Sequence, residues 1–278
     1  MAPSEQRDSA TPTALVTGAT GGIGGAIARL FAENGVRVLA TGRDPDRAAA
    51  FGRGLATATG TECLGVELDV TNQGTLEALK TTAEEFGPID WVINNAGVAD
   101  TAPVLSQSNQ PLLRRMMEVN FYGPLRLFHL FAPGMIERGH GRVVQIASSA
   151  ALQGYPYVTA YSSTKHALLG WSRSAALECA PKGVGISTIC PHYVDTPLTD
   201  RSIESMKEKT GRTDEDLRAF VAGQNPSGVI VAPEEVAKVA LELARGDLGG
   251  VVIEMPGGST ETIDEGVAIA VPATGGRN

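Results

Sequence analysis

Short apolar stretches alternate with longer amphipathic stretches along most of the chain, and this alternation is the feature that most constrains the fold. The apolar stretches predict seven strands, at residues 14–16, 36–41, 62–68, 89–93, 142–147, 185–189 and 251–254. The stretches between them predict helices at residues 23–34, 45–58, 73–86, 112–136, 160–180 and 233–245. A helix between two strands returns the chain to start the next strand in the same direction. The pattern therefore predicts an α/β fold with a doubly wound, seven-stranded parallel sheet and helices on both faces.

The domain organisation that we expect is a single catalytic domain over residues 13–258. The chain is 42% hydrophobic and 19% charged, which is an ordinary globular composition, and no linker-like stretch divides its interior. Residues 198–228 interrupt the alternation of strand and helix, so we interpret them as a lid over the substrate. The polar residues 1–12 and the Gly-rich residues 259–278 are expected to be tails or edge appendages.

Charge and cysteine content exclude several classes of partner. The net charge of −8 argues against nucleic acid or an anionic membrane surface as a general partner, because such partners select clustered Lys and Arg. Cys63, Cys179 and Cys190 have no spaced partner, so neither a disulfide framework nor a metal site is predicted. No signal peptide or membrane-length apolar run is recognisable, and we expect a cytoplasmic protein.

A glycine-rich turn follows the first predicted strand and directly precedes the first predicted helix. Glycine lets the backbone approach a pyrophosphate without Cβ obstruction, and the helix offers unpaired N–H groups to the anion. The alternative is a tight strand-to-helix turn that binds no ligand. The position of the glycines, directly after a strand and directly before a helix, favours a dinucleotide site. The residues expected to hold it here are Gly18, Thr20, Gly21, Gly22, Ile23 and Gly24.

The end of the second predicted strand bears on the choice of cofactor, because the adenosine ribose lies against it. An acidic side chain at position 42 would repel a 2′-phosphate, but the chain has Gly42 there and Arg43 next. Arg43 is suited to pair with a phosphate, so NADP(H) is favoured over NAD(H). Asp44 and Asp46 weaken this preference, and NAD(H) stays possible.

Two further strand ends are expected to contact the cofactor. Asp69 is placed to bind the adenine amino group, although an isolated Asp is equally suited to cap a helix. The Asn-rich run after the fourth predicted strand suits close approach of a ribose, or a turn held by Asn side chains. The cofactor contacts expected from these two loops are Asp69, Val70, Asn95, Ala96 and Gly97.

Tyr161 and Lys165 lie four residues apart near the start of a predicted helix, so the phenol and the ammonium share one face. Such pairs are common, but Ser148 stands just past a predicted strand, in a loop where ligands gather. A free phenol has a pKa of about 10, and a neighbouring ammonium and an oxidised nicotinamide both favour the phenolate. The residues predict that Tyr161 exchanges a proton with a substrate hydroxyl or carbonyl.

These marks jointly resemble the short-chain dehydrogenase/reductase (SDR) family over residues 13–258. They are the glycine turn, the run at residues 94–97, Asn120, Ser148, the Tyr161 and Lys165 pair, and residues 191–196. The resemblance implies a single Rossmann domain, a homotetramer (or dimer), and a catalytic tetrad of Asn120, Ser148, Tyr161 and Lys165. It also implies that Tyr161 and Lys165 contact the cofactor, and that Asn120 anchors a water linking Lys165 to solvent.

The segment after the sixth predicted strand departs from the family pattern, which usually has Gly where this chain has His192. Pro191, Val194 and Thr196 are expected to line the nicotinamide carboxamide. His192 is interpreted either as a substrate contact or as a tolerated loop residue, because one His without a spaced partner does not indicate a metal.

The walls of the substrate site are expected to be apolar. Ser148, Leu152, Tyr155, Tyr161 and His192 are the predicted substrate contacts, and they favour a small-molecule ketone or secondary alcohol of 3-oxoacyl, steroid-like or other apolar type. Cationic side chains of the lid are either a solvated face or contacts to the phosphates of a carrier thioester: Arg201, Lys207, Lys209, Arg212 and Arg218. We predict an NAD(P)-dependent oxidoreductase; the alternatives are a non-catalytic redox sensor and an epimerase or dehydratase.

Overall fold

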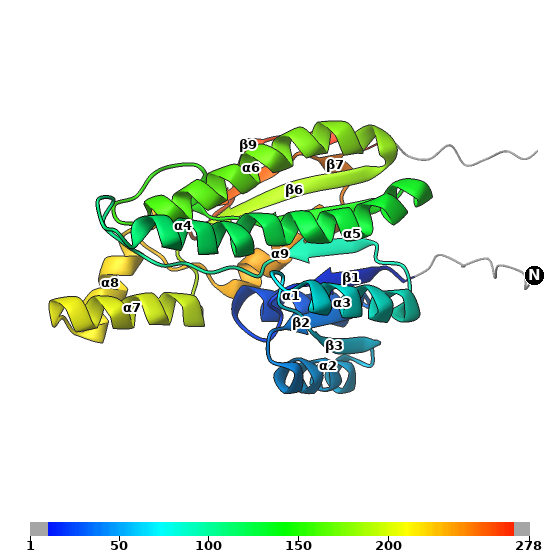
Figure 1. Cartoon of the computed structure of the whole chain (residues 1–278), viewed down its shortest axis with the longest axis horizontal. Coiled ribbons are helices and arrows are strands. Elements are labelled where there is room, and N and C mark those ends of the chain that lie inside the picture. Colours follow the sequence, from blue (N-terminus) through cyan, green and yellow to red (C-terminus); the bar gives the residue numbers. More distant parts are fainter. Residues whose placement is uncertain (1–10, 270–278) are drawn as a thin grey trace, which may run out of the picture.

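The structure, a computed structural model, describes residues 11–269. Residues 1–10 and 270–278, which make up most of the first predicted tail and the end of the second, lie outside the described residues. Within the described part of the chain, no helix combines the length and apolarity needed to cross a membrane. Figure 1 shows a central sheet between two layers of helices, with α7 and α8 projecting at one end.

The main sheet has eight strands in the order β3-β2-β1-β4-β5-β6-β8-β9, which confirms the doubly wound architecture and corrects the predicted number of seven. The first seven in that order are parallel to one another. They are β1 (Thr13–Val16), β2 (Arg37–Gly42), β3 (Cys63–Glu67), β4 (Trp91–Asn94), β5 (Gly141–Ile146), β6 (Val184–Pro191) and β8 (Val252–Met255). The order reverses between β1 and β4, where such folds place their ligands.

The segment from residue 259 onward, expected to be a tail or an edge appendage, contains two strands. β9 (Glu261–Asp264) pairs antiparallel with β8, and β10 (Val267–Ala268) pairs antiparallel with β7 (Leu248–Gly249). The side chain of Arg173 also donates to Asp264 over 2.7 Å. Residues 261–264 are therefore an edge appendage of the sheet and not a tail. Their strand was not predicted, because an edge strand gains much of its stability from ladder hydrogen bonds and needs no apolar alternation.

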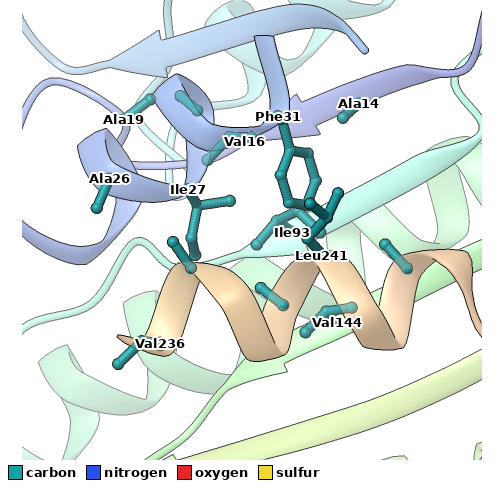
Figure 2. Packing of buried hydrophobic residues seen from close by; sticks show 14 of the residues in the cluster. Ala14, Val16, Ala19, Ala26, Ile27, Phe31, Ile93, Val144, Val236 and Leu241 are labelled. Carbon is teal, nitrogen blue, oxygen red and sulfur yellow. The ribbon is translucent and has the colours of Figure 1, made fainter. Parts of the chain in front are cut away.

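Two hydrophobic clusters hold the helices against the sheet. One lies under α1 (Gly22–Glu33), α2 (Pro45–Thr59) and α9 (Pro233–Arg245), and the other under α3 (Gln73–Phe86), α5 (Gly123–Arg138) and α6 (Thr159–Cys179). In Figure 2, Ile27 and Phe31 of α1 lie beside Leu241 of α9, and together they pack on the sheet residues Ile93 and Val144. This packing fixes the start of α1, which carries the glycine turn.

Local signals set the ends of several helices. Asp44 caps α2 by accepting a hydrogen bond from the Arg47 backbone N–H over 3.0 Å, and Asn72 caps α3 in the same way through Gly74 over 2.8 Å. Gly60 ends α2 in the left-handed region, at a φ of 70°. Asp44 and Asn72 follow β2 and β3, so these two caps fix loops at the carboxyl ends of strands.

The helical region predicted at residues 112–136 is divided in the structure. It comprises α4 (Asn109–Met117), a π-helical turn η1 (Glu118–Tyr122), and α5. Asn120 lies in the π-helical turn and forms side-chain hydrogen bonds with the backbone of Val98. A π turn inserts one extra residue into the helix and is often found at functional sites. The long helical region predicted there is confirmed, but the π turn within it was not predicted, because the contact of Asn120 with Val98 spans 22 residues of sequence.

Two helices and two short 3₁₀ turns complete the fold. The predicted lid contains α7 (Pro197–Thr210) and α8 (Asp214–Ala222), which pack on each other through Ile203, Leu217 and Val221. The turns are η2 (Ser149–Ala151), directly after β5, and η3 (Ala180–Lys182). The lid helices follow β6, so they stand at the carboxyl edge of the sheet.

Candidate active site

The glycine turn between β1 and α1 has the conformation and the open surface that a dinucleotide cradle requires. Gly18 and Gly22 have φ of +63° and +56°, which only glycine adopts without strain. A Cβ on Gly24 would overlap the carbonyl oxygen of Gly18 and the side chain of Asn95, whereas a Cβ on Gly21 would meet no atom within 4 Å. The open side at Gly21 fits a pyrophosphate at the helix N-terminus. Ile23, by contrast, is half-buried against the core.

Thr17 joins the glycine turn to the loop after β4. Its hydroxyl oxygen accepts hydrogen bonds from the backbone N–H groups of Asn95 and Ala96, both over 2.9 Å. The Asn95 amide in turn donates to the Thr17 carbonyl over 2.8 Å. The Asn95 side chain, predicted to contact the cofactor, therefore braces the two loops that would hold it. Sequence reasoning treated Thr17 only as part of the turn.

At the end of β2, a side chain at position 42 would require Thr20 to shift. A Cβ on Gly42 would lie 2.7 Å from the methyl group of Thr20. Arg43 is exposed, and Asp44 is occupied as the cap of α2. Asp69 accepts hydrogen bonds from the backbone and hydroxyl of Thr71, over 2.9 and 2.7 Å.

The charge of Asp69 is stabilised by its neighbours. Although partial burial opposes the shift, the hydrogen bonds from Thr71 and the positive charge of Arg43 lower the pKa of this carboxyl. Asp69 is not a helix cap, since Asn72 caps α3. Val70 is buried and lies close to Gly123 at the start of α5.

Asn120 and Lys165 come together at the carboxyl ends of β4 and β5. The Asn120 amide accepts from Val98 N–H over 2.9 Å and donates to Val98 C=O over 2.8 Å and to the Thr164 hydroxyl over 3.1 Å. Lys165 donates to the backbone carbonyl of Ile146 over 2.9 Å. Both residues are almost wholly buried, with 1% and 5% of their surface exposed. Gly97 lies beside both side chains, since a Cβ built there would be 3.4 Å from Asn120 Oδ1 and 3.8 Å from Lys165 Nζ.

Tyr161 and Ser148 border the same region. Tyr161 is half-buried, and Lys165 Nζ lies 5.7 Å from the centre of its ring. The Ser148 hydroxyl oxygen accepts a hydrogen bond from Ala150 N–H over 3.1 Å, which holds it at the start of η2. The structure thus brings all four residues of the predicted tetrad to one edge of the sheet.

The ionisation of the pair differs from the sequence expectation. Burial raises the pKa of Tyr161 to about 12; its interaction with Ser148 opposes the rise, whereas Cys190 and Tyr193 add to it. Burial also lowers the pKa of Lys165 to about 8. In the protein without a bound ligand, desolvation raises the pKa of the Tyr161 phenol by more than the Lys165 ammonium lowers it. Tyr161 therefore stays protonated at neutral pH, and forming its phenolate would require positive charge nearby.

The predicted substrate residues divide into two groups. Leu152 packs on a small cluster with Ala151 and Leu169, and the Tyr155 hydroxyl donates to the Ser149 hydroxyl over 2.9 Å. His192 has a different partner: its Nε2 lies 2.7 Å from a carboxylate oxygen of Glu254 on β8, and its side chain is buried. The structure gives His192 a partner within the protein, which neither interpretation from the sequence had foreseen.

The loop after β6 closes against the glycine turn. Pro191 ends β6 and is paired with Met255, and Val194 forms a bridge with Val231. Thr196 caps α7, and its methyl group is the nearest atom to a Cβ built on Gly22, at 3.4 Å. The segment expected to line the nicotinamide therefore borders the pyrophosphate turn.

Most of the lid cations whose side chains are described have partners in the lid itself. Arg218 pairs with Asp200 over 2.6 Å and lies 3.5 Å from Asp195, and Lys207 pairs with Asp214 over 2.6 Å. Arg212 lies over the ring of Phe220, 5.4 Å from its centre. These contacts favour the solvated-face interpretation over contacts with a carrier phosphate.

Sequence reasoning gave no role to Tyr193 and Asn225. Asn225 is buried, and its amide bonds to the backbone of Tyr193. The two residues lie 32 positions apart, so no local pattern could reveal the contact. Within the described part of the chain, no group of three His, Cys, Asp or Glu side chains is arranged to hold a metal ion.

Comparisons with known proteins agree with this geometry. The profile of the family described as short chain dehydrogenase matches residues 12–207. The chain is 32% identical over 259 residues to the D-beta-hydroxybutyrate dehydrogenase of Rhizobium meliloti, covering 90% of this chain and 99% of that protein. It is also 32% identical over 236 residues to the galactitol 2-dehydrogenase of Agrobacterium fabrum, covering 84% and 90%.

Among solved structures, a variant of actinorhodin polyketide ketoreductase with NADPH superposes with a TM-score of 0.82. The two sequences are 30% identical, and the match covers 90% of this chain and 97% of that one. The fold, the geometry of the site and these relatives lead to one conclusion. The chain belongs to the short-chain dehydrogenase/reductase family.

Proposed function

We propose that Tyr161 is the general acid and base of a reversible hydride transfer between a nicotinamide cofactor and a secondary alcohol or ketone. The chain is an NAD(P)-dependent oxidoreductase of alcohols and ketones. The observation that carries the proposed role is the half-buried Tyr161 beside a buried Lys165 at the carboxyl edge of the sheet. The apolar, half-buried Leu152 in the loop after β5 supports an apolar substrate of the 3-oxoacyl or steroid-like kind. The homotetramer or dimer implied by the family resemblance stays a prediction.

The residues of the site fit a dinucleotide. The glycine turn would hold the pyrophosphate, the loop of Asn95 to Gly97 and Lys165 the nicotinamide ribose, and Val194 with Thr196 the carboxamide. When bound, the cofactor supplies or takes up the hydride. The cradle at Gly21, which a Cβ would fill, supports this assignment.

The proton chemistry follows from the protein groups. In carbonyl reduction, Tyr161 donates its proton to the substrate oxygen as the carbon gains a hydride, and in alcohol oxidation it accepts that proton. Ser148 donates a hydrogen bond to the same oxygen and stabilises its developing charge. Lys165 stabilises the phenolate left after donation, and Asn120, held rigid by Val98 and Thr164, anchors a path for reprotonation.

The residues at the end of β2 favour NADP(H). Position 42 is Gly and carries no carboxylate that would repel a 2′-phosphate, and Asp44 is committed to capping. Arg43 is exposed and available to pair with that phosphate. NAD(H) stays the alternative, because the exposed Arg43 is equally able to stack on adenine.

The decisive test of the mechanism is Tyr161→Phe. Removing the hydroxyl takes away the proton donor and leaves the ring, so cofactor binding should persist while turnover falls by about three orders of magnitude or more. Cofactor binding is measured by fluorescence titration and turnover by nicotinamide absorbance. Near-normal turnover in this variant would falsify the proposed role.

Arg43→Ala tests the choice of cofactor. Loss of a charge-assisted phosphate contact should weaken NADPH binding by about tenfold or more, whereas NADH binding should change little. Both affinities are measured by titration with the wild type beside the variant. An unchanged ratio of the two affinities contradicts the phosphate assignment.

A further inference from the structure

Arg126, in the first turn of α5, bridges two segments of the chain that are far apart in the sequence. Its Nη1 donates to the backbone carbonyl of Val70 over 3.2 Å, and its Nη2 donates to a carboxylate oxygen of Glu118 over 2.6 Å. Val70 belongs to the loop after β3, whereas Glu118 is the first residue of the π-helical turn η1. The proposed mechanism gives this arginine no role.

The guanidinium of Arg126 also bonds to the oxygen that closes the π turn. The backbone N–H of Gly123 donates to the carbonyl of Glu118, and a bond between residues i and i+5 is the one that defines a π helix. Nη1 of Arg126 donates to the same carbonyl oxygen over 3.4 Å. A π turn interrupts the regular ladder of α-helical hydrogen bonds. Arg126 therefore adds side-chain bonds at the place where the backbone ladder is interrupted.

Apolar contacts join the same two segments. The Val70 side chain is buried, and a Cβ built on Gly123 would lie 2.6 Å from its Cγ2, so a side chain at position 123 would require Val70 to shift. Val119 of η1 packs against the hydrophobic cluster that contains Val70. The loop after β3 and the π turn are thus held together by the guanidinium of Arg126 and by close packing.

The two bridged segments serve different parts of the proposed site. The loop after β3 carries Asp69, the expected adenine contact, and the Thr75 hydroxyl bonds to both backbone groups of Asp69, over 2.8 and 3.2 Å. The π turn carries Asn120, whose side chain bonds to both backbone groups of Val98. Each segment is therefore braced within itself, and Arg126 connects the two. An arginine suits this task because its planar fork bonds a carboxylate and a carbonyl at once in a fixed geometry.

We propose that Arg126 is a positioning residue that couples the adenine end of the cofactor site to Asn120. The inference rests on the proposed function and extends it to the way in which cofactor binding prepares the proton path. A bound adenine holds the loop after β3, Arg126 passes this order to the π turn, and Asn120 stays in place for reprotonation. Coupling of this kind is a free energy shared between two sites, so it is lost when the bridge between them is removed.

The first test measures this coupling without turnover. Adenosine 2′,5′-bisphosphate and ADP occupy only the adenine end, and the one that binds more tightly is used at saturation while backbone hydrogen exchange is followed. In wild type, exchange of residues 118–123 should slow by about fivefold when the fragment binds. In Arg126→Met, which keeps most of the side-chain stem, residues 68–72 should still be protected by the fragment but residues 118–123 should not.

Two further variants accompany this test. Arg173→Met is the matched control, because Arg173 forms a comparable half-exposed ion pair with Asp264 over 2.7 Å, and it should leave the protection of the π turn unchanged. Arg126→Lys keeps the positive charge beside Glu118 and guards against a loss of folding. Its ammonium lacks the fork that reaches Val70 at the same time, so this variant should lose the protection as well.

The second test measures turnover at saturating cofactor. Arg126→Met should lower kcat by about fivefold while KM for the substrate stays within about twofold, because the bridge acts through Asn120 and the proton path and not through substrate binding. Arg173→Met should change neither value. A rise in KM with kcat unchanged contradicts the positioning role.

The exchange measurements can overturn the inference in three ways. Equal protection of the π turn in wild type and Arg126→Met shows that the two segments communicate without this arginine. Protection in neither protein shows that the adenine end and the π turn are not coupled. Full protection in Arg126→Lys shows that positive charge alone suffices and that the bridge to Val70 has no role. Exchange does not depend on turnover, and the proposed function is tested separately by Tyr161→Phe, so the two failures are distinguishable.

Discussion

The two sides of the active site are held in place by different kinds of contact. On the cofactor side, Thr17, Asn95 and Gly24 hold the loops after β1 and β4 in close backbone contact. The strands and helices that these loops join are packed in the two large hydrophobic clusters. On the substrate side, α7 and α8 share a cluster with only Ile203, Leu217 and Val221 fully buried, and exposed ion pairs tie them together.

This difference fits the two tasks. A dinucleotide is the same in every turnover, so the glycine turn is built at close contact, where one added methyl group has no space. Segments that must admit and release a substrate are drawn from the less stable parts of a fold. The comparison predicts that small changes on the cofactor side have large effects and that polar changes in the lid have small ones.

Gly24→Ala should have the largest effect. The added Cβ would overlap the Gly18 carbonyl and the Asn95 amide, so helix α1 must move away from β1. We expect a loss of about 1–3 kcal/mol in the free energy of unfolding, and cofactor binding weakened by more than about tenfold. Denaturant unfolding and cofactor titration measure the two quantities.

Gly21→Ala is the matched control for this prediction. Its Cβ would meet no protein atom, so stability should stay within about 0.5 kcal/mol of wild type while cofactor affinity falls. The two variants separate an effect on stability from an effect on cofactor binding. The close-packing argument is wrong if Gly24→Ala keeps its stability, and the cradle assignment is wrong if Gly21→Ala binds cofactor normally.

The pH dependence of carbonyl reduction should follow Lys165. Burial lowers its pKa to about 8, so the ammonium is present below that pH and is lost as the pH rises through it. Tyr161, with its pKa raised to about 12, stays protonated over the same range. We expect kcat/KM for reduction to fall by up to about tenfold per pH unit above pH 8.

Lys165→Arg sharpens this test, because guanidinium keeps its charge throughout the range. Residual activity in that variant should no longer decline between pH 8 and 10. A wild-type profile that is flat to pH 10 would show that the charge of Lys165 is not needed for reduction. The pH profile must be measured at saturating cofactor, with stability checked at each pH.

Much of the cofactor side could be predicted from the sequence because its signals are local. The glycine turn follows a buried strand directly, and Tyr161 and Lys165 are separated by one helical turn, so spacing alone places them. Seven of the eight strands of the main sheet were found from apolar stretches, with ends shifted by a few residues. These features need no knowledge of contacts between distant residues.

What the sequence could not predict depends on such contacts. The π turn at Asn120 is associated with bonds to Val98 and Thr164, and His192 has its partner Glu254 62 residues away. β9 is a polar edge strand that is held by its pairing with β8. It lacks the apolar stretch by which the other strands were predicted. The rise of the Tyr161 pKa likewise results from burial in the folded chain, which spacing does not reveal.

The smallest effect is expected for Arg218→Ala in the lid. Its ion pairs with Asp195 and Asp200 lie at half-exposed side chains, so solvent screens them and their loss should cost less than about 1 kcal/mol. Leu217→Ala, at the neighbouring position, removes a buried side chain and should cost about 2 kcal/mol or more in local stability. Hydrogen exchange of α7 and α8 measures both variants against wild type. If Arg218→Ala loosens the lid as much as Leu217→Ala does, ion pairs and not the small apolar cluster hold it, and the contrast between the two sides of the site must be redrawn.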